Sequence, residues 1–143
     1  MTIELPIVPP TTTAQQKRVR LIRGRRGKVV PAFFKSDALE QAESDYLILL
    51  QQHRPPAPLQ GPLELSVAFV WPHLASTPAR LRGQEIPKVT RPDADNLVKQ
   101  LTDCLVKLQF LYDDSQIARL VATKLHGQVG CVRIGLIAFE GVS

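Results

Sequence analysis

The chain has 143 residues, of which 44% are hydrophobic, and its 18 basic against 13 acidic residues give a net charge of +5. This composition predicts one globular domain over residues 1–143 and excludes a chain that is disordered throughout. No apolar run is long enough to cross a membrane. Cys104 and Cys131 lie among apolar neighbours, which indicates reduced core residues of a cytoplasmic protein. The three histidines are isolated and are expected at the surface.

The positive charge is segregated. No acidic residue occurs between Glu4 and Asp37, and that interval contains Lys17, Arg18, Arg20, Arg23, Arg25, Arg26, Lys28 and Lys35. A basic block of this kind favours an anionic partner, with nucleic acid first, although a solubilising arm would have the same composition. A membrane surface is a poorer partner, because the block lacks the apolar face of an amphipathic anchor.

In chain order, the first expected element is a short edge strand at residues 2–8, in which apolar residues alternate before two prolines. Residues 17–35 predict a basic hairpin with RGRRG as its turn. Residues 37–53 begin with a capping pattern and continue with apolar residues at helical spacing. Residues 63–71 alternate strictly, which predicts a strand.

Residues 72–92 are rich in Pro, Gly, Ser and Thr and predict a basic loop without regular structure. A loop of this length is uncommon in a compact domain and is often functional. A helical stripe over residues 97–108 and strand patterns at residues 116–125 and 130–139 complete the chain. This order predicts an α/β or α+β fold, in which helices pack against a small mixed β-sheet. The candidate DNA-binding residues lie in the hairpin and the loop: Lys17, Arg18, Arg20, Arg23, Arg25, Arg26, Lys28, Arg80, Arg82, Lys88 and Arg91.

Two acidic residues, Asp93 and Asp95, stand one residue apart just before the expected helix. In extended backbone, residues two apart point the same way and are separated by about 7 Å at Cα. A hard divalent cation such as Mg²⁺ would neutralise such a carboxylate pair. Asp is also a favoured helix cap, so the pair alone does not decide between a cap and a metal site.

Lys99 follows Asp95 by one helical turn, and Asp103 and Lys107 continue the same face. Asp103 and Lys107 are expected to form an exposed ion pair of little energetic value. Lys99 has two interpretations: a solvated partner of Asp95, or a cation that neutralises phosphate charge beside a metal.

A second acidic pair, Asp113 and Asp114, lies in YDDSQI between the helix and the next strand. Neighbouring side chains diverge in extended backbone, so at most one is expected to point toward the first pair, and a surface turn is the alternative. A carboxylate pair, a lysine one turn later and an acid returning after one helix together predict an oxygen-rich metal site.

The segments PDADNLVKQLTDCL and YDDSQI resemble the RusA family of Holliday-junction resolvases, small endonucleases of bacteria and their phages. The resemblance implies metal-binding catalytic carboxylates at Asp93, Asp95 and Asp114, with Lys99 as the catalytic lysine. It further implies that Asp113 is auxiliary and that the local architecture is fixed by Asn96, Asp103 and Gln116. The family often opens with Pro-Pro-Ser-x-Asn, whereas here Pro9-Pro10-Thr11-Thr12-Thr13 lacks the Asn.

The function expected from the resemblance is a Mg²⁺-dependent endodeoxyribonuclease, with Mn²⁺ able to substitute and without an organic cofactor. It would act as a homodimer on branched DNA, because a four-way junction has two-fold symmetry and needs two nicks. One alternative keeps the chemistry and changes the substrate to flaps, forks or single strands. The other is a DNA-binding module without turnover, which would bind in a salt-sensitive, Mg²⁺-independent way.

Overall fold

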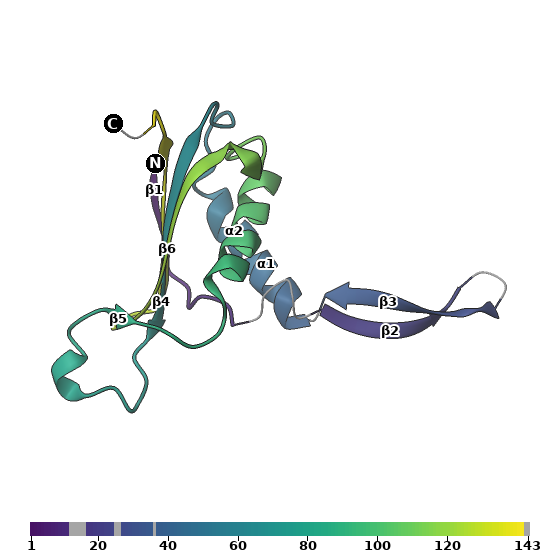
Figure 1. Ribbon diagram of the computed structural model, residues 1–143, viewed down its shortest axis with the longest axis horizontal. Helices are drawn as coiled ribbons and strands as arrows, with labels where there is room; N and C mark the ends of the chain where they lie inside the picture. Colours follow the sequence, from purple (N-terminus) through teal and green to yellow (C-terminus); the bar gives the residue numbers. More distant parts are fainter. Residues whose placement is uncertain (12–16, 25–26, 36, 142–143) are drawn as a thin grey trace.

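The computed structural model describes residues 1–11, 17–24, 27–35 and 37–141. Figure 1 shows the arrangement of its helices and strands. In chain order these are β1 (Thr2–Leu5), β2 (Lys17–Arg23), β3 (Val29–Lys35), α1 (Asp37–Gln51), β4 (Leu63–Pro72), η2 (Ala79–Leu81), β5 (Ile86–Pro87), α2 (Ala94–Lys107), η3 (Asp114–Gln116), β6 (Ile117–Gly127) and β7 (Cys131–Ala138).

A five-stranded mixed sheet in the order β1-β7-β4-β6-β5 forms the body of the molecule. β4 and β6 are parallel, and the other neighbours are antiparallel. α2 lies between β4 and β6 in the chain, and both helices cover the same face of the sheet (Figure 1). The predicted α+β fold, with helices packed against a small mixed sheet, is confirmed. No helix in the described part of the chain is long and apolar enough to span a bilayer.

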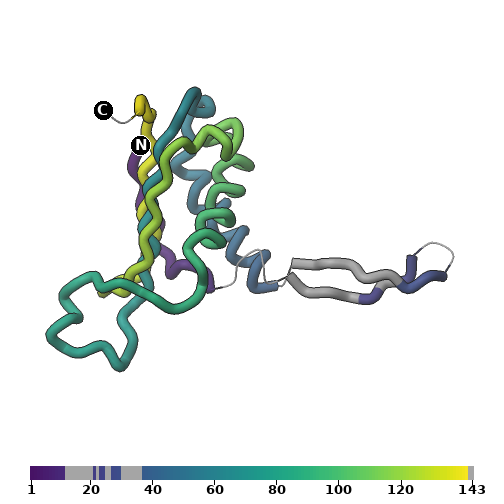
Figure 2. The backbone as a smooth tube through the Cα atoms, in the orientation of Figure 1, coloured from purple at the N-terminus to yellow at the C-terminus, as the bar shows by residue number. Residues whose placement is uncertain are grey.

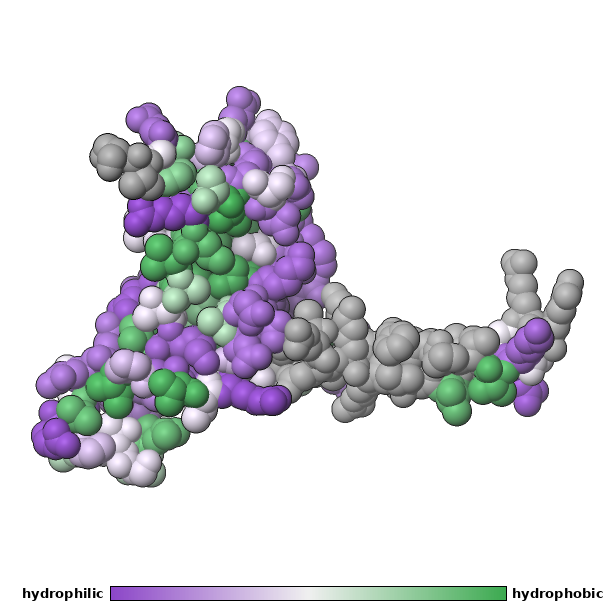
Figure 3. Space-filling view, in the orientation of Figure 1, coloured by the Kyte–Doolittle hydropathy of each residue, from purple (hydrophilic) through white to green (hydrophobic). Residues whose placement is uncertain are grey.

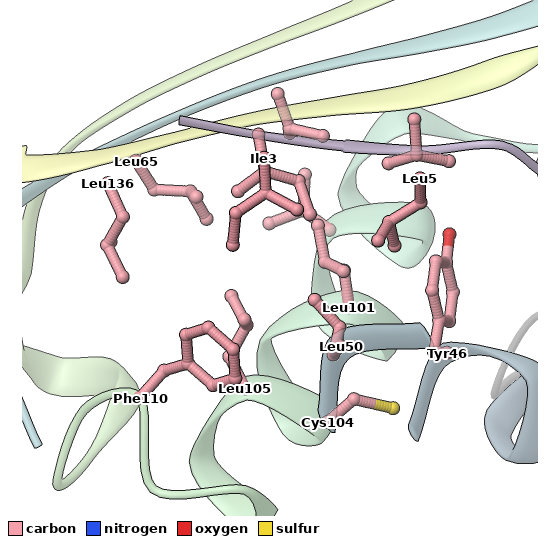
Figure 4. Close-up of a cluster of buried hydrophobic side chains, with 14 of the residues drawn as sticks. Ile3, Leu5, Tyr46, Leu50, Leu65, Leu101, Cys104, Leu105, Phe110 and Leu136 are labelled. Atoms are coloured by element: carbon pink, nitrogen blue, oxygen red, sulfur yellow. The ribbon is translucent and has the colours of Figure 1, made fainter. Parts of the chain in front are cut away.

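The core lies between the sheet and the two helices. The apolar residues that alternate along β4 turn one face inward, and α1 contributes Tyr46 and Leu50 (Figure 4). α2 packs the predicted stripe, with Leu101, Cys104 and Leu105, against them. Aliphatic side chains of two layers therefore exclude water from a single core.

The two cysteines are free and buried, as predicted. The expectation that all three histidines lie at the surface is wrong for His126, which is only 8% exposed. Its position explains the difference, because β6 turns His126 inward opposite Trp71 of β4. On this inward face, the Nδ1 atom of the His126 ring lies 3.2 Å from the carbonyl oxygen of Pro72.

The predicted hairpin is confirmed as a separate two-stranded sheet of β2 and β3, from Lys17 opposite Lys35 to Arg23 opposite Val29. At its turn, Gly24 N donates to the carbonyl oxygen of Lys28 at 2.6 Å. Figure 1 shows this ribbon extending away from the five-stranded sheet. Two of the candidate DNA-binding residues in the turn, residues 25 and 26, lie outside the described residues.

The segment between β4 and α2 is not without regular structure, contrary to the sequence prediction. It contains η2 and the short strand β5, which pairs with the end of β6. Arg82 folds it back on itself by donating to the carbonyl oxygens of Leu74, Ala75 and Thr77 at 3.0–3.2 Å. Figure 2 shows the resulting loop projecting from the end of the sheet.

Candidate active site

The amino end of α2 positions the first acidic pair. Asp93 is the N-cap residue, with extended backbone (φ −70°, ψ 141°), yet its exposed side chain makes no capping hydrogen bond. Asp95 is exposed in the first turn, where its Oδ1 accepts a hydrogen bond from Asn96 N at 3.0 Å. A helix-capping role therefore explains the backbone conformation of Asp93, but it does not explain why the residue has a carboxylate side chain.

Lys99 bridges the helix to the segment that follows it. Its Nζ lies 3.1 Å from Asp103 Oδ1 and 3.4 Å from Asp114 Oδ2. Hydrogen bonds and charge from Asp103, and then from Asp114, raise the pKa of the Lys99 ammonium above its usual value. Lys99 therefore remains a cation at neutral pH and is unsuited to act as a base.

The ion pair expected between Asp103 and Lys107, and the pairing of Lys99 with Asp95 that was one of its two interpretations, both differ from the ion pairs observed. Lys99 pairs with Asp103 instead of Asp95, and Lys107 pairs with Glu43 of α1 instead of Asp103. The reason is tertiary. On one face of a helix, a charged residue can pair with the residue four positions before it or four positions after it. Which ion pair forms here depends on the side chains that α1 and η3 bring to α2.

The side chains of Asp113 and Asp114 point in different directions, as expected for neighbouring residues, and make different contacts. The Asp113 carboxylate accepts hydrogen bonds from the backbone and hydroxyl of Ser115 and caps η3. These hydrogen bonds from Ser115 lower the pKa of Asp113. Asp114 is left to face Lys99. Asp113 is thus tied into the turn, while Asp114 is the acid that reaches the α2 site.

Gln116 holds the turn in place with both ends of its amide. Its Oε1 accepts from the backbone N–H groups of Tyr112 and Asp113 at 2.7 and 3.1 Å. Its Nε2 donates to the carbonyl oxygens of Leu59 and Gly61, each at 3.0 Å. Gln116 therefore connects the acidic turn to the chain just before β4.

The three aspartates expected to bind metal are not preassembled. Among residues 1–11, 17–24, 27–35 and 37–141, no three His, Cys, Asp or Glu side chains are close enough to hold a metal ion together. Asp114 lies against Lys99, one turn along α2 from Asp95. The donor chemistry fits a hard divalent cation, because Asp93, Asp95 and Asp114 offer exposed carboxylate oxygens. The assignment of these three as ligands stays a prediction.

Comparison with known proteins decides the family. The family described as "Endodeoxyribonuclease RusA" matches residues 7–136, which includes both acidic segments. The chain belongs to the RusA family. It is also 28% identical over 123 residues to "Crossover junction endodeoxyribonuclease rusA" of Lactococcus phage r1t, a match that covers 86% of each chain. Membership places this chain among nucleases and confirms the resemblance carried by the acidic segments.

One residue near the candidate site was missed in the sequence analysis. Lys124 of β6 is half-buried, and its Nζ donates to the carbonyl oxygens of Thr90 and Pro92 at 2.7 and 2.8 Å. It thereby holds the chain immediately before Asp93. Its position in the strand could have indicated this. Alternate residues of a β-strand point to the same face, and Lys124 lies two residues before buried His126, so its side chain points inward.

The predicted DNA-binding residues that the structure describes, which leaves out residues 25 and 26, fall into three groups. Arg23, Lys28, Arg80 and Arg91 are exposed, so their charges can reach a phosphate backbone. Arg82 and Lys88 already have partners in the protein: Arg82 binds loop carbonyls, whereas Lys88 donates to Thr90 Oγ1 and lies 5.0 Å from the Trp71 ring centroid. For Lys17, Arg18 and Arg20 the structure describes the position in β2 alone.

Proposed function

We propose that this chain is a Mg²⁺-dependent endodeoxyribonuclease that resolves four-way DNA junctions by paired nicks, acting as a homodimer. The observation that carries the proposal is the bridge from Lys99 to Asp114, which joins the two acidic segments of the family motif at one place. The named activity of the phage relative, a crossover junction endodeoxyribonuclease, supports the choice of substrate.

In this proposal Asp93, Asp95 and Asp114 hold the cation, with Mn²⁺ able to replace Mg²⁺. The bound ion would supply Lewis-acid charge to the scissile phosphate. Lys99 remains protonated, so it offers positive charge to the oxygens on which negative charge develops. Asp103 keeps the Lys99 ammonium on the exposed face of α2, at 3.1 Å.

The cation would compete with Lys99 for the Asp114 carboxylate. Both are positive, and Asp114 Oδ2 is 3.4 Å from the ammonium. Lys99 retains Asp103 as a second partner, so it can release Asp114 without losing every counter-charge. The site can thereby exchange one ion pair for a metal contact while the lysine stays close to the substrate.

Regions of opposite charge support a nuclease over a passive binder. Without a metal, the acidic pairs Asp93–Asp95 and Asp113–Asp114 would repel DNA, whereas the hairpin and the 72–92 loop carry basic residues that attract phosphates. A structure-selective nuclease needs both, because phosphate contacts position the backbone and the acidic site acts on it. A binding module needs only the basic regions.

The test is cleavage of a synthetic mobile four-way junction, beside flap and splayed-arm DNA, with Mg²⁺, Mn²⁺ or EDTA. We expect paired nicks in the junction that depend on the metal. Asp95→Asn is expected to lower the cleavage rate by about 100-fold or more while junction binding persists. Glu40→Gln, an exposed acid of α1, is the matched control and should cleave normally. An Asp95→Asn protein that cleaves at the native rate would remove Asp95 from the site.

A further inference from the structure

Two lysines stand side by side at one end of the five-stranded sheet. Lys88, just after β5, lies opposite Lys124 of β6, because Lys88 N donates to the carbonyl oxygen of Lys124 at 2.9 Å. Both ammonium groups also bind the same residue. Lys88 Nζ donates to Thr90 Oγ1 and Lys124 Nζ donates to the Thr90 carbonyl oxygen, each at 2.7 Å. The two positive charges therefore meet at Thr90.

This arrangement of like charges is unfavourable for the protein alone. Like charges that lie opposite each other on neighbouring strands destabilise a sheet. Both lysines are half-buried, and burial, followed by the charge of Lys124, lowers the pKa of the Lys88 ammonium. In the described part of the chain, no carboxylate within 4.0 Å neutralises either lysine.

Each ammonium keeps hydrogen-bonding capacity for a ligand. A protonated lysine has three N–H donors. Lys124 uses two of them, for the carbonyl oxygens of Thr90 and Pro92. Lys88 uses one for Thr90 Oγ1, and its Nζ lies 5.0 Å from the centroid of the Trp71 ring, which attracts the cation without neutralising it. An anion that accepts one hydrogen bond from each lysine would relieve their repulsion.

The lysine pair lies next to the acidic site. Lys124 binds the carbonyl oxygen of Pro92, and Asp93 is the next residue. Trp71 and Lys124 are near the carboxyl ends of the parallel strands β4 and β6, which is the end where open sheets with parallel strands bind ligands. On the face seen in Figure 3, hydrophilic surface fills the region where the 72–92 loop joins the sheet and helix layers, below a patch of apolar atoms.

We propose that Lys88 and Lys124 together bind one DNA phosphate, the neighbour of the scissile phosphate on the strand that is cut. A phosphate carries the negative charge and the several acceptor oxygens that two ammonium groups need. DNA presents phosphates at regular intervals, so one can lie on the lysine pair while the next lies at the acidic site. This inference rests on the proposed function and deepens it by naming a contact that places the strand for cleavage.

Lys88 is the better residue for a test. Lys124 also anchors Pro92, whereas Lys88 binds a side-chain hydroxyl, so Lys88→Met removes one charge of the pair without releasing the chain before Asp93. Lys88→Arg keeps the charge, and a guanidinium also stacks on an aromatic ring. Lys107→Met is the matched control, because it removes the same charge from the last turn of α2.

The experiment combines these variants with a change in the DNA. In immobile four-way junctions, one phosphate at a time across the exchange point is replaced by a neutral methylphosphonate, and binding to the Asp95→Asn protein is titrated. We expect one position at which the replacement weakens binding by about 10-fold. Adding Lys88→Met should weaken binding to the unmodified junction by a similar factor and abolish the effect at that position. Lys88→Arg and Lys107→Met should retain the effect. If Lys88→Met and Lys107→Met respond alike at every position, the inference is wrong.

Trp71 provides a second readout, because it is the only tryptophan in the chain and lies beneath the Lys88 ammonium. Its fluorescence emission should change when the unmodified junction is added, and should not change with the junction that carries the methylphosphonate at the sensitive position. Inorganic phosphate at the same phosphate concentration should have no effect. An equal change with inorganic phosphate would assign the site to a free anion and overturn the DNA contact.

Neither readout depends on cleavage, so the two proposals can fail separately. If one phosphate is sensitive to Lys88 and the unmodified protein leaves junctions intact, the proposed function is refuted and the phosphate site stands. If junctions are cut and no phosphate is sensitive to Lys88, the phosphate site is refuted and the proposed function stands.

Discussion

Lys124→Met tests whether the sheet positions the acidic site. Lys124 donates two charge-assisted hydrogen bonds, to the carbonyl oxygens of Thr90 and Pro92. Methionine keeps the apolar stem and removes both donors. The Thr90 carbonyl lies in exposed chain and can bind water, so the cost comes mainly from the buried Pro92. A hydrogen bond from a charged group contributes about 1.5–3 kcal/mol, and we expect a loss of about 2 kcal/mol.

For a domain of this size, that loss corresponds to a fall in Tm of roughly 7 °C, measured by circular dichroism. Asp93 directly follows Pro92, so releasing the segment should also displace the first carboxylate. A misplacement of about 1 Å can cost about 100-fold in rate, and we expect a 10- to 100-fold slower single-turnover cleavage, partly restored by Lys124→Arg.

The control is a core substitution of mild cost away from the site. Ile134→Val of β7 should lose about 1 kcal/mol and cleave at the native rate at 25 °C. If Lys124→Met melts and cleaves as the unmodified protein does, the two hydrogen bonds do not hold the site. If it melts lower but cleaves normally, Lys124 stabilises the loop without positioning Asp93.

Two further predictions concern charge at the site and at the hairpin. Lys99→Met should lower the cleavage rate by about 100-fold or more with little change in Tm, because the ion pairs of Lys99 are exposed. Lys107→Met on the same helix is the control and should cleave normally. Equal cleavage rates for the two variants would contradict the role of Lys99. Replacing residues 18–34 by a short Gly-Ser linker should weaken junction binding and reduce its salt dependence, because the segment carries basic residues that can bind phosphates. The measurement is a binding titration at several salt concentrations. An unchanged salt dependence would indicate that the hairpin is a solubilising arm.

Most of the fold was predictable because its elements depend on local patterns. β4 alternates strictly, and the hairpin has a glycine-flanked turn between two apolar runs. The order of the strands in the sheet was not predictable, since pairing β6 between β4 and β5 joins segments distant in sequence. The regular elements within residues 72–92 were missed for the same reason: β5 exists only because the end of β6 is there to pair with it.

The site shows the same division. The spacing of Asp95 and Lys99 placed both on one face of α2, which the helix confirms. The partner of Lys99 was beyond the sequence, because it depends on where η3 brings Asp114. Lys124 carries no motif at all. Its contribution arises from a β-strand that lies far from Asp93 in the chain and beside it in the fold.

The acidic side chains of the site contribute little to the stability of the fold, and the two side chains that hold the site in place, Lys124 and Gln116, are not acids. Lys99, Asp95 and Asp114 are exposed, whereas both ends of the motif are fixed to other parts of the chain. Lys124 ties the residue before Asp93 to β6, and Gln116 ties the turn before β6 to the chain before β4. Substitutions should therefore separate into two classes. Changes to the exposed charges of Asp95, Lys99 and Asp114 should mainly alter the rate, whereas changes to the two anchors should alter rate and stability together, because the anchors bind carbonyl oxygens that are part-buried.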